Sequence, residues 1–221
     1  MPLHTENLLD LTHTIAAPYL EQFEFPWDAL SGLKDLIVSL GPTLGSDYTE
    51  KAPQVWIHKD AIVFESAYIA APCIIGKGAE IRHCAFLRGS IIVGENAVVG
   101  NSTELKNVIL FDNVQVPHYN YVGDSILGYK AHMGAGSITS NVKSDKTLVS
   151  VKNGTQALST GLKKFGAILG DNVEVGCGSV LNPGTVIGRN SNIYPLSSVR
   201  AFVPAGSIYK TRQEVVSKRE M

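Results

Sequence analysis

The chain has 221 residues, with 19 Lys and Arg side chains against 20 Asp and Glu, so its formal net charge is −1. This balance excludes a strongly basic surface, and we expect neither a nucleic-acid partner nor a membrane partner. The longest apolar stretches are too short to span a bilayer, and the first residues do not form a signal peptide. The three cysteines lack metal-ligand spacing, which favours reduced thiols. We therefore expect a cytoplasmic protein without a bound metal.

The first part of the chain has a helical pattern. Between Pro26 and Gly41, apolar residues recur at helical spacing, and the two flanking residues act as start and stop signals. An earlier helix is expected around residues 6–17, whose leucines and isoleucine form a second apolar stripe. We interpret residues 1–50 as a helical cap over the open first coil of the repeat that follows, because an uncapped coil exposes backbone groups.

After this segment, an aliphatic residue returns at every sixth position, which is the strongest pattern in the sequence. The first run consists of Ile57, Val63, Ile69, Ile75, Ile81, Leu87, Val93, Val99 and Leu105, and the second of Leu169, Val175, Leu181, Ile187, Ile193 and Val199. An α-helix cannot keep such residues on one face, because six steps rotate it by roughly 240°. Short strands with a corner every six residues satisfy the spacing, with the aliphatic residues stacked inward.

This spacing resembles the hexapeptide-repeat family of left-handed parallel β-helices. The resemblance implies an all-β solenoid with three short strands in each coil of 18 residues, and a sandwich of short strands is the alternative. On that geometry residues 55–204 make about eight coils, stacked at ~4.8 Å. We expect the β-helical domain to span residues 51–210.

Two further segments depart from the repeat. The pattern fails within residues 140–167, where we expect an excursion loop or hairpin that leaves the solenoid. Such an excursion is often functional in repeat proteins, and a neutral insertion is the alternative. Residues 211–221 are expected to end the chain as a tail with a short, charged helix.

Cations interrupt the small residues that usually follow an inward aliphatic position. Arg88 and Lys106 each follow a leucine and are 18 residues apart, so in the expected fold they lie one above the other at ~5 Å. Like charges at that distance repel, and a phosphate between them would turn repulsion into attraction. The alternative is that both side chains diverge into solvent, with Glu104 or Glu95 nearby.

The segment VPHYNYVGD, residues 116–124, places a histidine, two tyrosines and an aspartate within an otherwise aliphatic and glycine-rich pattern. An imidazole has a pKa near 6.5, which suits a general base at neutral pH. His118 is therefore a candidate base, and a surface loop histidine is the alternative. Asp124 is a candidate to orient His118, and a structural role in the turn is equally compatible with its position.

The segments GNSTELKN and VPHYNYVGDSILGYKAHMGAGSITSN resemble the acetyltransferase domain of the bacterial bifunctional glucosamine-1-phosphate acetyltransferase/N-acetylglucosamine-1-phosphate uridylyltransferase family. The resemblance implies acetyl-CoA as co-substrate and an amino-sugar phosphate, such as glucosamine 1-phosphate, as acceptor. It also implies a homotrimer with the site between prisms. On this basis the catalytic base is His118, and the sugar-phosphate contacts are Arg88, Lys106 and Tyr121, with Glu104 beside them.

The same resemblance assigns residues to acetyl-CoA. Ala135 lies in the region that lines the acetyl-CoA channel, Asn141 matches a family asparagine there, and His132 stands where the family usually has an asparagine near the acetyl group. A backbone N–H in this glycine-rich stretch would stabilise a tetrahedral oxyanion. Lys143 or Lys146 is the candidate replacement for a family lysine that reaches the sugar phosphate from a neighbouring subunit.

Two other functions are compatible with the pattern. A metal-dependent carbonic anhydrase on the same fold uses two histidines about five residues apart, but Gly123 lies five residues after His118, and Ser90 stands where that group has an acidic residue. The other alternative is a non-catalytic sugar-phosphate or sugar-nucleotide binding module that partners a separate nucleotidyltransferase, because these 221 residues contain no nucleotidyltransferase pattern.

Overall fold

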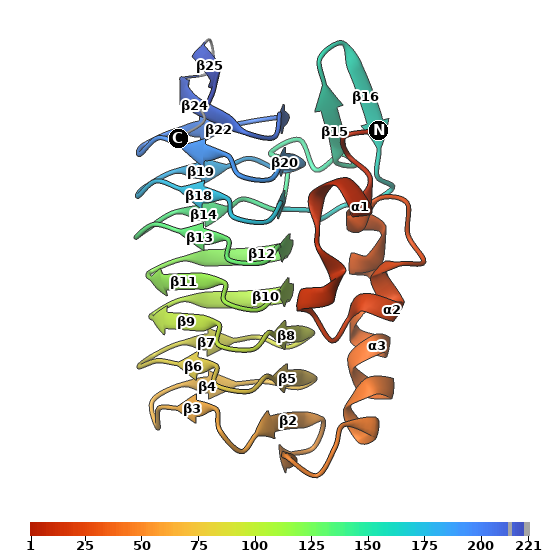
Figure 1. Ribbon diagram of the computed structural model, residues 1–221, viewed down its shortest axis with the longest axis vertical. Helices are drawn as coiled ribbons and strands as arrows, with labels where there is room; N and C mark the ends of the chain where they lie inside the picture. The colour runs from red at the N-terminus through yellow and green to blue at the C-terminus, as the bar shows by residue number, and fades with distance from the viewer. Residues whose placement is uncertain (212–213, 219–221) are drawn as a thin grey trace.

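The computed structural model describes residues 1–211 and 214–218. It is a column of stacked coils, with the N-terminal helices along one side and a separate hairpin near one end (Figure 1). The prediction of an all-β, left-handed parallel β-helix is confirmed. None of the helices in these described ranges is long and apolar enough to cross a membrane.

The helical elements all precede the column. They are α1 (Thr5–Leu8), η1 (Leu11–His13), α2 (Ala17–Leu20), η2 (Pro26–Gly32), α3 (Leu33–Leu40) and η3 (Gly41–Thr43).

Most strands belong to two sheets, here called sheet A and sheet B. Sheet A contains β1 (Tyr48–Ala52), β2 (Val55–His58), β4 (Tyr68–Ile69), β5 (Cys73–Ile75), β7 (Phe86–Leu87), β8 (Ile91–Val93), β10 (Glu104–Leu110), β12 (Tyr121–Leu127), β14 (Ile138–Thr139), β17 (Ala167–Leu169), β19 (Val180–Leu181), β20 (Thr185–Ile187), β22 (Ser198–Val199) and β23 (Phe202–Val203). Sheet B contains β3 (Ile62–Val63), β6 (Glu80–Ile81), β9 (Val98–Asn101), β11 (Gln115–His118), β13 (His132–Met133), β18 (Glu174–Val175), β21 (Asn192–Ile193), β24 (Ser207–Thr211) and β25 (Glu214–Ser217). The separate hairpin pairs β15 (Ser150–Asn153) with β16 (Gln156–Ser159).

The aliphatic repeat forms the inner core of this column. Strands of successive coils pair in parallel, so that Ile75 stacks on Val93 and Leu87 stacks on Leu105. All four side chains are fully buried. The six-residue spacing therefore marks the residues whose side chains point into the core, as the sequence predicts.

The repeat loses its register after Leu105 because one corner becomes shorter. Leu87 and Val93 are six residues apart, whereas their partners on the next coil, Leu105 and Leu110, are five apart. The shortened corner contains Asn107, whose φ of +55° is left-handed, a conformation that asparagine tolerates better than most residues. Because the corner is tight, β10 runs through it as one seven-residue strand, and β12 repeats the same arrangement on the next coil.

The interpretation of residues 1–50 as a cap over the first coil is wrong. The segment runs along one side of the column, opposite in direction to the stacking of the coils (Figure 1). Asp171 donates its backbone N–H to Leu8, and Asp112, on an earlier coil, donates its backbone N–H to His13. The first coil is covered instead by β1, which pairs antiparallel with β2.

An apolar outer face explains this placement. The central residues of successive sheet A strands stack in register as Trp56, Ile74, Ile92, Ile109, Ile126, Ile168 and Val186. We call these seven residues the isoleucine column. They point away from the inner core, yet all are buried. Each buried isoleucine contributes about 1.5–3 kcal/mol relative to exposure, so the N-terminal segment stabilises the fold by covering them.

The excursion within residues 140–167 contains the β15–β16 hairpin. Its base is packed against the column, since Val149 and Val151 are buried. A Cβ at Gly184 would lie 2.6 Å from the carbonyl oxygen of Ser150, so the hairpin strand approaches the column at backbone contact. The excursion therefore has a defined position against the last coils.

The prediction of a C-terminal helix is wrong for residues 214–217, which form β25. This strand pairs antiparallel with β24, with Ile208 opposite Val216 and Tyr209 opposite Val215. The last coil would otherwise present an open strand edge, and the adjacent valines favour an extended strand that pairs with it. Lys218 donates its backbone N–H to Gly206, and residues 212–213 and 219–221 of the predicted tail lie outside the described residues.

Candidate active site

The polar residues of the shortened corner form one hydrogen-bonded cluster, which we call the Asp124 corner. The buried Asp124 carboxylate accepts from Lys106 Nζ at 2.8 Å, from Asn107 Nδ2 at 3.0 Å and from Asn141 Nδ2 at 2.6 Å. Asp124 has a left-handed φ of +47°. Three donors from the two flanking coils, Lys106 and Asn107 on one and Asn141 on the other, therefore converge on one buried carboxylate. This arrangement assigns Asp124 to the corner and not to the orientation of His118.

Tyr121 joins this corner from the same strand. Its hydroxyl accepts from Asn141 Nδ2 at 3.2 Å, and a Cβ added at Gly123 would lie 2.5 Å from that hydroxyl. Burial, followed by the negative charges of Asp124 and Glu104, raises the pKa of Tyr121. The phenol therefore stays protonated at neutral pH and keeps its O–H to donate to a ligand.

Arg88 and Lys106 follow stacked leucines on neighbouring strands, as their spacing predicts, but each has its own carboxylate. Arg88 Nη1 lies 2.7 Å from Glu104 Oε1, and Lys106 is bound to Asp124. The Arg88 guanidinium also lies over the Phe86 ring, 5.8 Å from its centroid. Mutual repulsion of the two cations is thus relieved within the chain, and the guanidinium retains further N–H donors.

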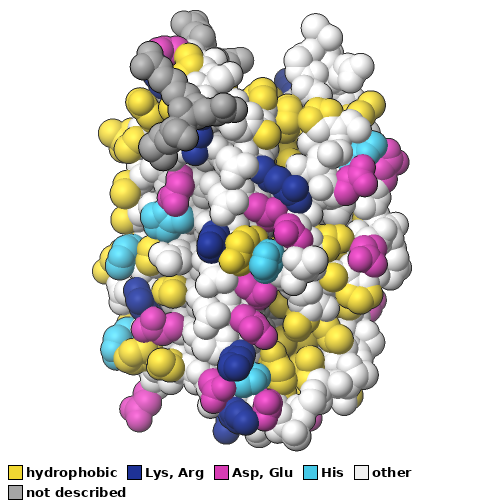
Figure 2. Space-filling view, in the orientation of Figure 1, with side chains coloured by type: hydrophobic (Ala, Val, Ile, Leu, Met, Phe, Trp, Pro, Cys, Tyr) yellow, Lys and Arg dark blue, Asp and Glu magenta, His cyan; other side chains and the backbone are white. Residues whose placement is uncertain are grey.

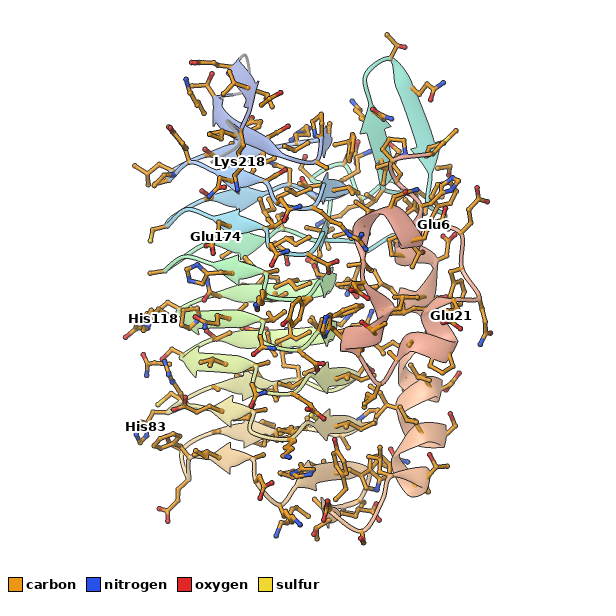
Figure 3. The ribbon with its side chains drawn as sticks, viewed as in Figure 1. Glu6, Glu21, His83, His118, Glu174 and Lys218 are labelled. Atoms are coloured by element: carbon orange, nitrogen blue, oxygen red, sulfur yellow. The ribbon has the colours of Figure 1, made fainter. Side chains whose placement is uncertain are left out.

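His118 ends β11, at a different edge of the column. Its strand neighbours on this edge are His83, Asn101, Ala135 and Cys177, in an array that we call the His118 edge. Figure 3 shows His83 and His118 along the side of the column that faces away from the N-terminal segment. The imidazole of His118 is exposed and makes no hydrogen bond with any residue that the structure describes.

Backbone contacts nonetheless fix the loop that carries His118. Asn120 is buried, and its Oδ1 accepts from the His118 N–H at 3.1 Å. Its Nδ2 donates to the carbonyl oxygens of Gly134 and Ser137 on the next coil, at 2.9 and 3.0 Å. Gly136 in turn donates its N–H to the His118 carbonyl. Asn120 is a positioning residue that the sequence reading missed.

His132 lies on the outer face of sheet B and has a partner that was not predicted. Its Nδ1 is 2.7 Å from Oε2 of Glu174 on the neighbouring strand. The pair borders a groove of about 490 Å³ whose floor includes Gly134 and Gly176. Glu174 is 42 residues from His132 because the excursion separates their coils, and no spacing rule relates the two in the sequence.

The structure therefore divides the predicted site residues among three places. Arg88, Glu104, Lys106, Tyr121 and Asn141 gather at or beside the Asp124 corner. Ala135 shares the His118 edge with His118, and His132 faces the sheet B groove. Lysine, arginine and acidic side chains are interspersed down the centre of the face in Figure 2, without a large patch of one sign.

Comparison with known proteins finds relatives that resemble this chain over most of its length. The bifunctional protein GlmU of Methanococcus vannielii is 34% identical over 88% of this chain and 48% of that protein. The bifunctional sugar-1-phosphate nucleotidylyltransferase/acetyltransferase of Sulfurisphaera tokodaii is 32% identical over 84% of this chain and 47% of that protein. The uncharacterized acetyltransferase YaiX of Escherichia coli is 29% identical over 76% of this chain and 72% of that protein.

The chain spans about half the length of the bifunctional relatives that it matches. These matches confirm the resemblance to hexapeptide-repeat acyltransferases of the bifunctional type that residues 100–141 indicated. The family described as the GMPPB C-terminal domain matches residues 73–190, which is more than half of the chain. By its fold and by this match, the chain belongs to the GMPPB C-terminal domain family.

Proposed function

We propose that this protein transfers the acetyl group of acetyl-CoA to the amine of an amino-sugar phosphate such as glucosamine 1-phosphate. The observation that carries the proposal is the gathering of a guanidinium, an ammonium, a carboxylate and a phenol at the Asp124 corner, whose Tyr121 is three residues along the chain from His118. The names of two relatives include the acetyltransferase activity.

His118 acts as the general base in this reaction. The unprotonated amine attacks the thioester carbonyl, the carbon–sulfur bond breaks, and the coenzyme leaves as a thiolate that takes up a proton. The attacking nitrogen loses its proton to the imidazole, which returns it to solvent or to the leaving sulfur. The exposed position of His118 lets it reach an amine held at the outer surface.

The acceptor is bound by the residues of the Asp124 corner and their neighbours. The Tyr121 hydroxyl and the remaining N–H groups of Arg88 donate to the sugar phosphate, and Lys106 adds positive charge. Glu104 is half-exposed, and it accepts from the amine or from a sugar hydroxyl. In this arrangement the phosphate lies beside Arg88 and Lys106. The carboxylates paired with these two cations hold them in position.

A homotrimer completes the site. His132 and the sheet B groove lie on a different face from the Asp124 corner, so one chain cannot close both around a single reaction centre. Between two chains, the sheet B face of one subunit can oppose the Asp124 corner of the next. Tyr68 and Phe86, on the corner's side of the column, are exposed aromatic residues suited to such a contact. Acetyl-CoA then lies in the interface, with His132, Ala135 and Asn141 as its contacts.

The test is thiol release from acetyl-CoA in the presence of glucosamine 1-phosphate. Wild-type protein should turn over, and His118→Ala should lose at least about a hundredfold in rate, the usual contribution of a general base. His83→Ala is the matched control, because His83 lies on the same edge and should leave the rate unchanged. Wild-type rates no higher than those of His118→Ala across several amino-sugar phosphates reject the proposal. Sugar-phosphate binding without coenzyme binding would then favour the non-catalytic module.

A further inference from the structure

A polar cavity lies between the excursion and the last coils, and we call it the hairpin pocket. Its volume is about 330 Å³, within the range of small-ligand sites. One wall comes from residues 142–152 of the excursion, and the other comes from Asn182 and Arg200 on successive coils. Apart from Lys143, one of the two candidate lysines for the sugar phosphate of a neighbouring subunit, none of the residues assigned to the acceptor, the base or the coenzyme lines it.

The hairpin pocket has an excess of positive charge. Lys143 Nζ lies 3.4 Å from Oδ2 of Asp145. Hydrogen bonds from the backbone and hydroxyl of Thr147 lower the pKa of Asp145, so this carboxylate stays ionised and balances Lys143. Lys152 and Arg200 have no carboxylate partner among the residues that the structure describes. Two cations therefore face the cavity uncompensated, in contrast to Arg88 and Lys106.

Neutral donors surround these cations. The hydroxyls of Ser140, Ser144 and Ser150 line the cavity and donate no hydrogen bond within the described part of the chain. Asn182 is fixed by bonds from its Nδ2 to Ser198 Oγ at 3.1 Å and to the Val199 carbonyl at 2.8 Å. Its Oδ1 faces Arg200 Nη2 at 3.4 Å and so aims the guanidinium. Free hydroxyls, an ammonium and an oriented guanidinium are the donors that a phosphate group prefers.

We propose that the hairpin pocket binds the phosphate of a ligand, with Arg200 and Lys152 as the charged contacts. The hairpin packs against the column at backbone contact, so the wall of the pocket that carries Lys152 has a fixed position relative to Arg200. The pocket thus supplies a role for the segment that interrupts the repeat.

The distance from the Asp124 corner limits what this ligand is. Lys106, Gly123, Ser140, Asn182 and Arg200 occupy the same position on successive coils, so Lys106 and Arg200 are four steps apart. At ~4.8 Å per step this is about 19 Å, longer than a single sugar phosphate. On the proposed function, the phosphate belongs either to the coenzyme or to the diphosphate of a nucleotide-linked acceptor.

Direct binding of pyrophosphate tests the pocket without any assumption about catalysis. Isothermal titration of the full chain should show binding that weakens by about tenfold or more in Lys152→Ala and in Arg200→Ala, as expected for the loss of a charged hydrogen bond. The double variant should not bind measurably. Arg200→Lys keeps the positive charge but loses the planar guanidinium fork. Its affinity for pyrophosphate should therefore lie between those of the wild type and Arg200→Ala.

Lys34→Ala is the matched control, since Lys34 is an exposed lysine on α3 and does not line the pocket. It should bind like the wild type. Unchanged melting temperatures confirm that the variants are folded. Absence of wild-type binding at millimolar pyrophosphate, or equal affinity in wild type and in the folded double variant, overturns the proposal.

Kinetics with shortened substrates then identify the source of the phosphate. If Arg200→Ala raises KM for acetyl-CoA but not for S-acetylpantetheine, which lacks the nucleotide phosphates, the pocket holds the coenzyme. If it raises KM only for a nucleotide-linked acceptor, the pocket holds that diphosphate. An active enzyme in which neither KM changes contradicts a role for the pocket in turnover. Pyrophosphate binding by a protein without transferase activity refutes the proposed function and leaves the pocket in place.

Discussion

Lys106 and Asp124 lie on successive coils, and their side chains form an ion pair with Nζ and Oδ1 2.8 Å apart. The aspartate side chain is 4% exposed and the lysine side chain 31%. A buried pair of this kind is not by itself evidence of stability, because desolvation offsets the attraction. Removing one partner, however, leaves the other uncompensated. The corner should therefore be sensitive to the loss of Asp124.

Replacement of Asp124 with Ala removes the shared acceptor of Lys106, Asn107 and Asn141. We expect the free energy of unfolding to fall by about 3 kcal/mol. For a chain of this size the melting temperature should then fall by roughly 6–12 °C. Asp124→Asn keeps the side-chain shape and one acceptor oxygen, so it should lose less. Urea unfolding compares the three proteins, and an Asp124→Ala protein as stable as the wild type would show that this carboxylate does not hold the corner.

Gly100 tests the backbone support of His118. A Cβ at Gly100 would overlap the backbone of Pro117, the residue before His118. We expect Gly100→Ala to destabilise the fold by about 1–3 kcal/mol, as overpacking does, and to lower the rate of acetyl transfer by displacing the His118 loop. Gly45→Ala is the control, because a Cβ there meets nothing within 4 Å. Melting curves and thiol-release assays on both variants provide the comparison, and equal behaviour of the two would contradict the expected displacement.

Cys73 differs from the other two cysteines in its environment. Complete burial raises the pKa of the Cys73 thiol to about 12, whereas Cys84 and Cys177 are exposed. An aromatic disulfide reagent at pH 8 should therefore modify at most two thiols in the native protein and all three in urea. Rapid modification of three thiols without denaturant would contradict the burial of Cys73.

The raised pKa of Cys73 makes the free energy of unfolding depend on pH. Because the folded-state pKa lies above the unfolded value, the unfolded chain loses the thiol proton first. The contribution of Cys73 to stability is complete below about pH 9 and declines as the pH rises towards 12. Cys73→Ala should remove this decline. Urea unfolding of both proteins between pH 8 and about 10 measures the difference in slope.

Trp27 tests the packing of the N-terminal segment. Its side chain is buried, stacked on Phe25 with ring centroids 4.7 Å apart, and 5.9 Å from the Phe165 ring at the end of the excursion. Trp27→Ala should lower the free energy of unfolding by about 3–5 kcal/mol. Tyr119→Ala, at an aromatic side chain that is 66% exposed, should change it far less. Equal effects of the two substitutions would show that the segment does not depend on this contact.

The column itself could be predicted because its cause is local and periodic. Ile75, Val93 and Leu105 each mark an inward position at six-residue spacing, and only a coiled strand path keeps such residues on one side. The loss of register after Leu105 was also visible, although its cause, a corner shortened by one residue at Asn107, required the strand pairing.

The N-terminal segment could not be placed from its own pattern. Its amphipathic stripe predicts helices but not which surface they cover. The surface that the segment covers is indicated by runs of three aliphatic residues in the repeat, such as Ile91-Ile92-Val93. In each run the middle side chain points outward and must be covered to be buried. Seven such residues stack into the isoleucine column only when the coils are assembled, and the predicted end cap was wrong for that reason.

The sequence by itself determined the solenoid, its inward residues and the residue types available for chemistry, because a six-residue period acts over neighbouring strands. Only the tertiary structure decided how charges are paired. Arg88 meets Glu104 and Lys106 meets Asp124, each across adjacent coils, while Lys152 and Arg200 come together from the excursion and a late coil without a carboxylate partner in the described chain. An ion pair depends on separations of a few ångströms between side chains, and no repeat in the sequence specifies them.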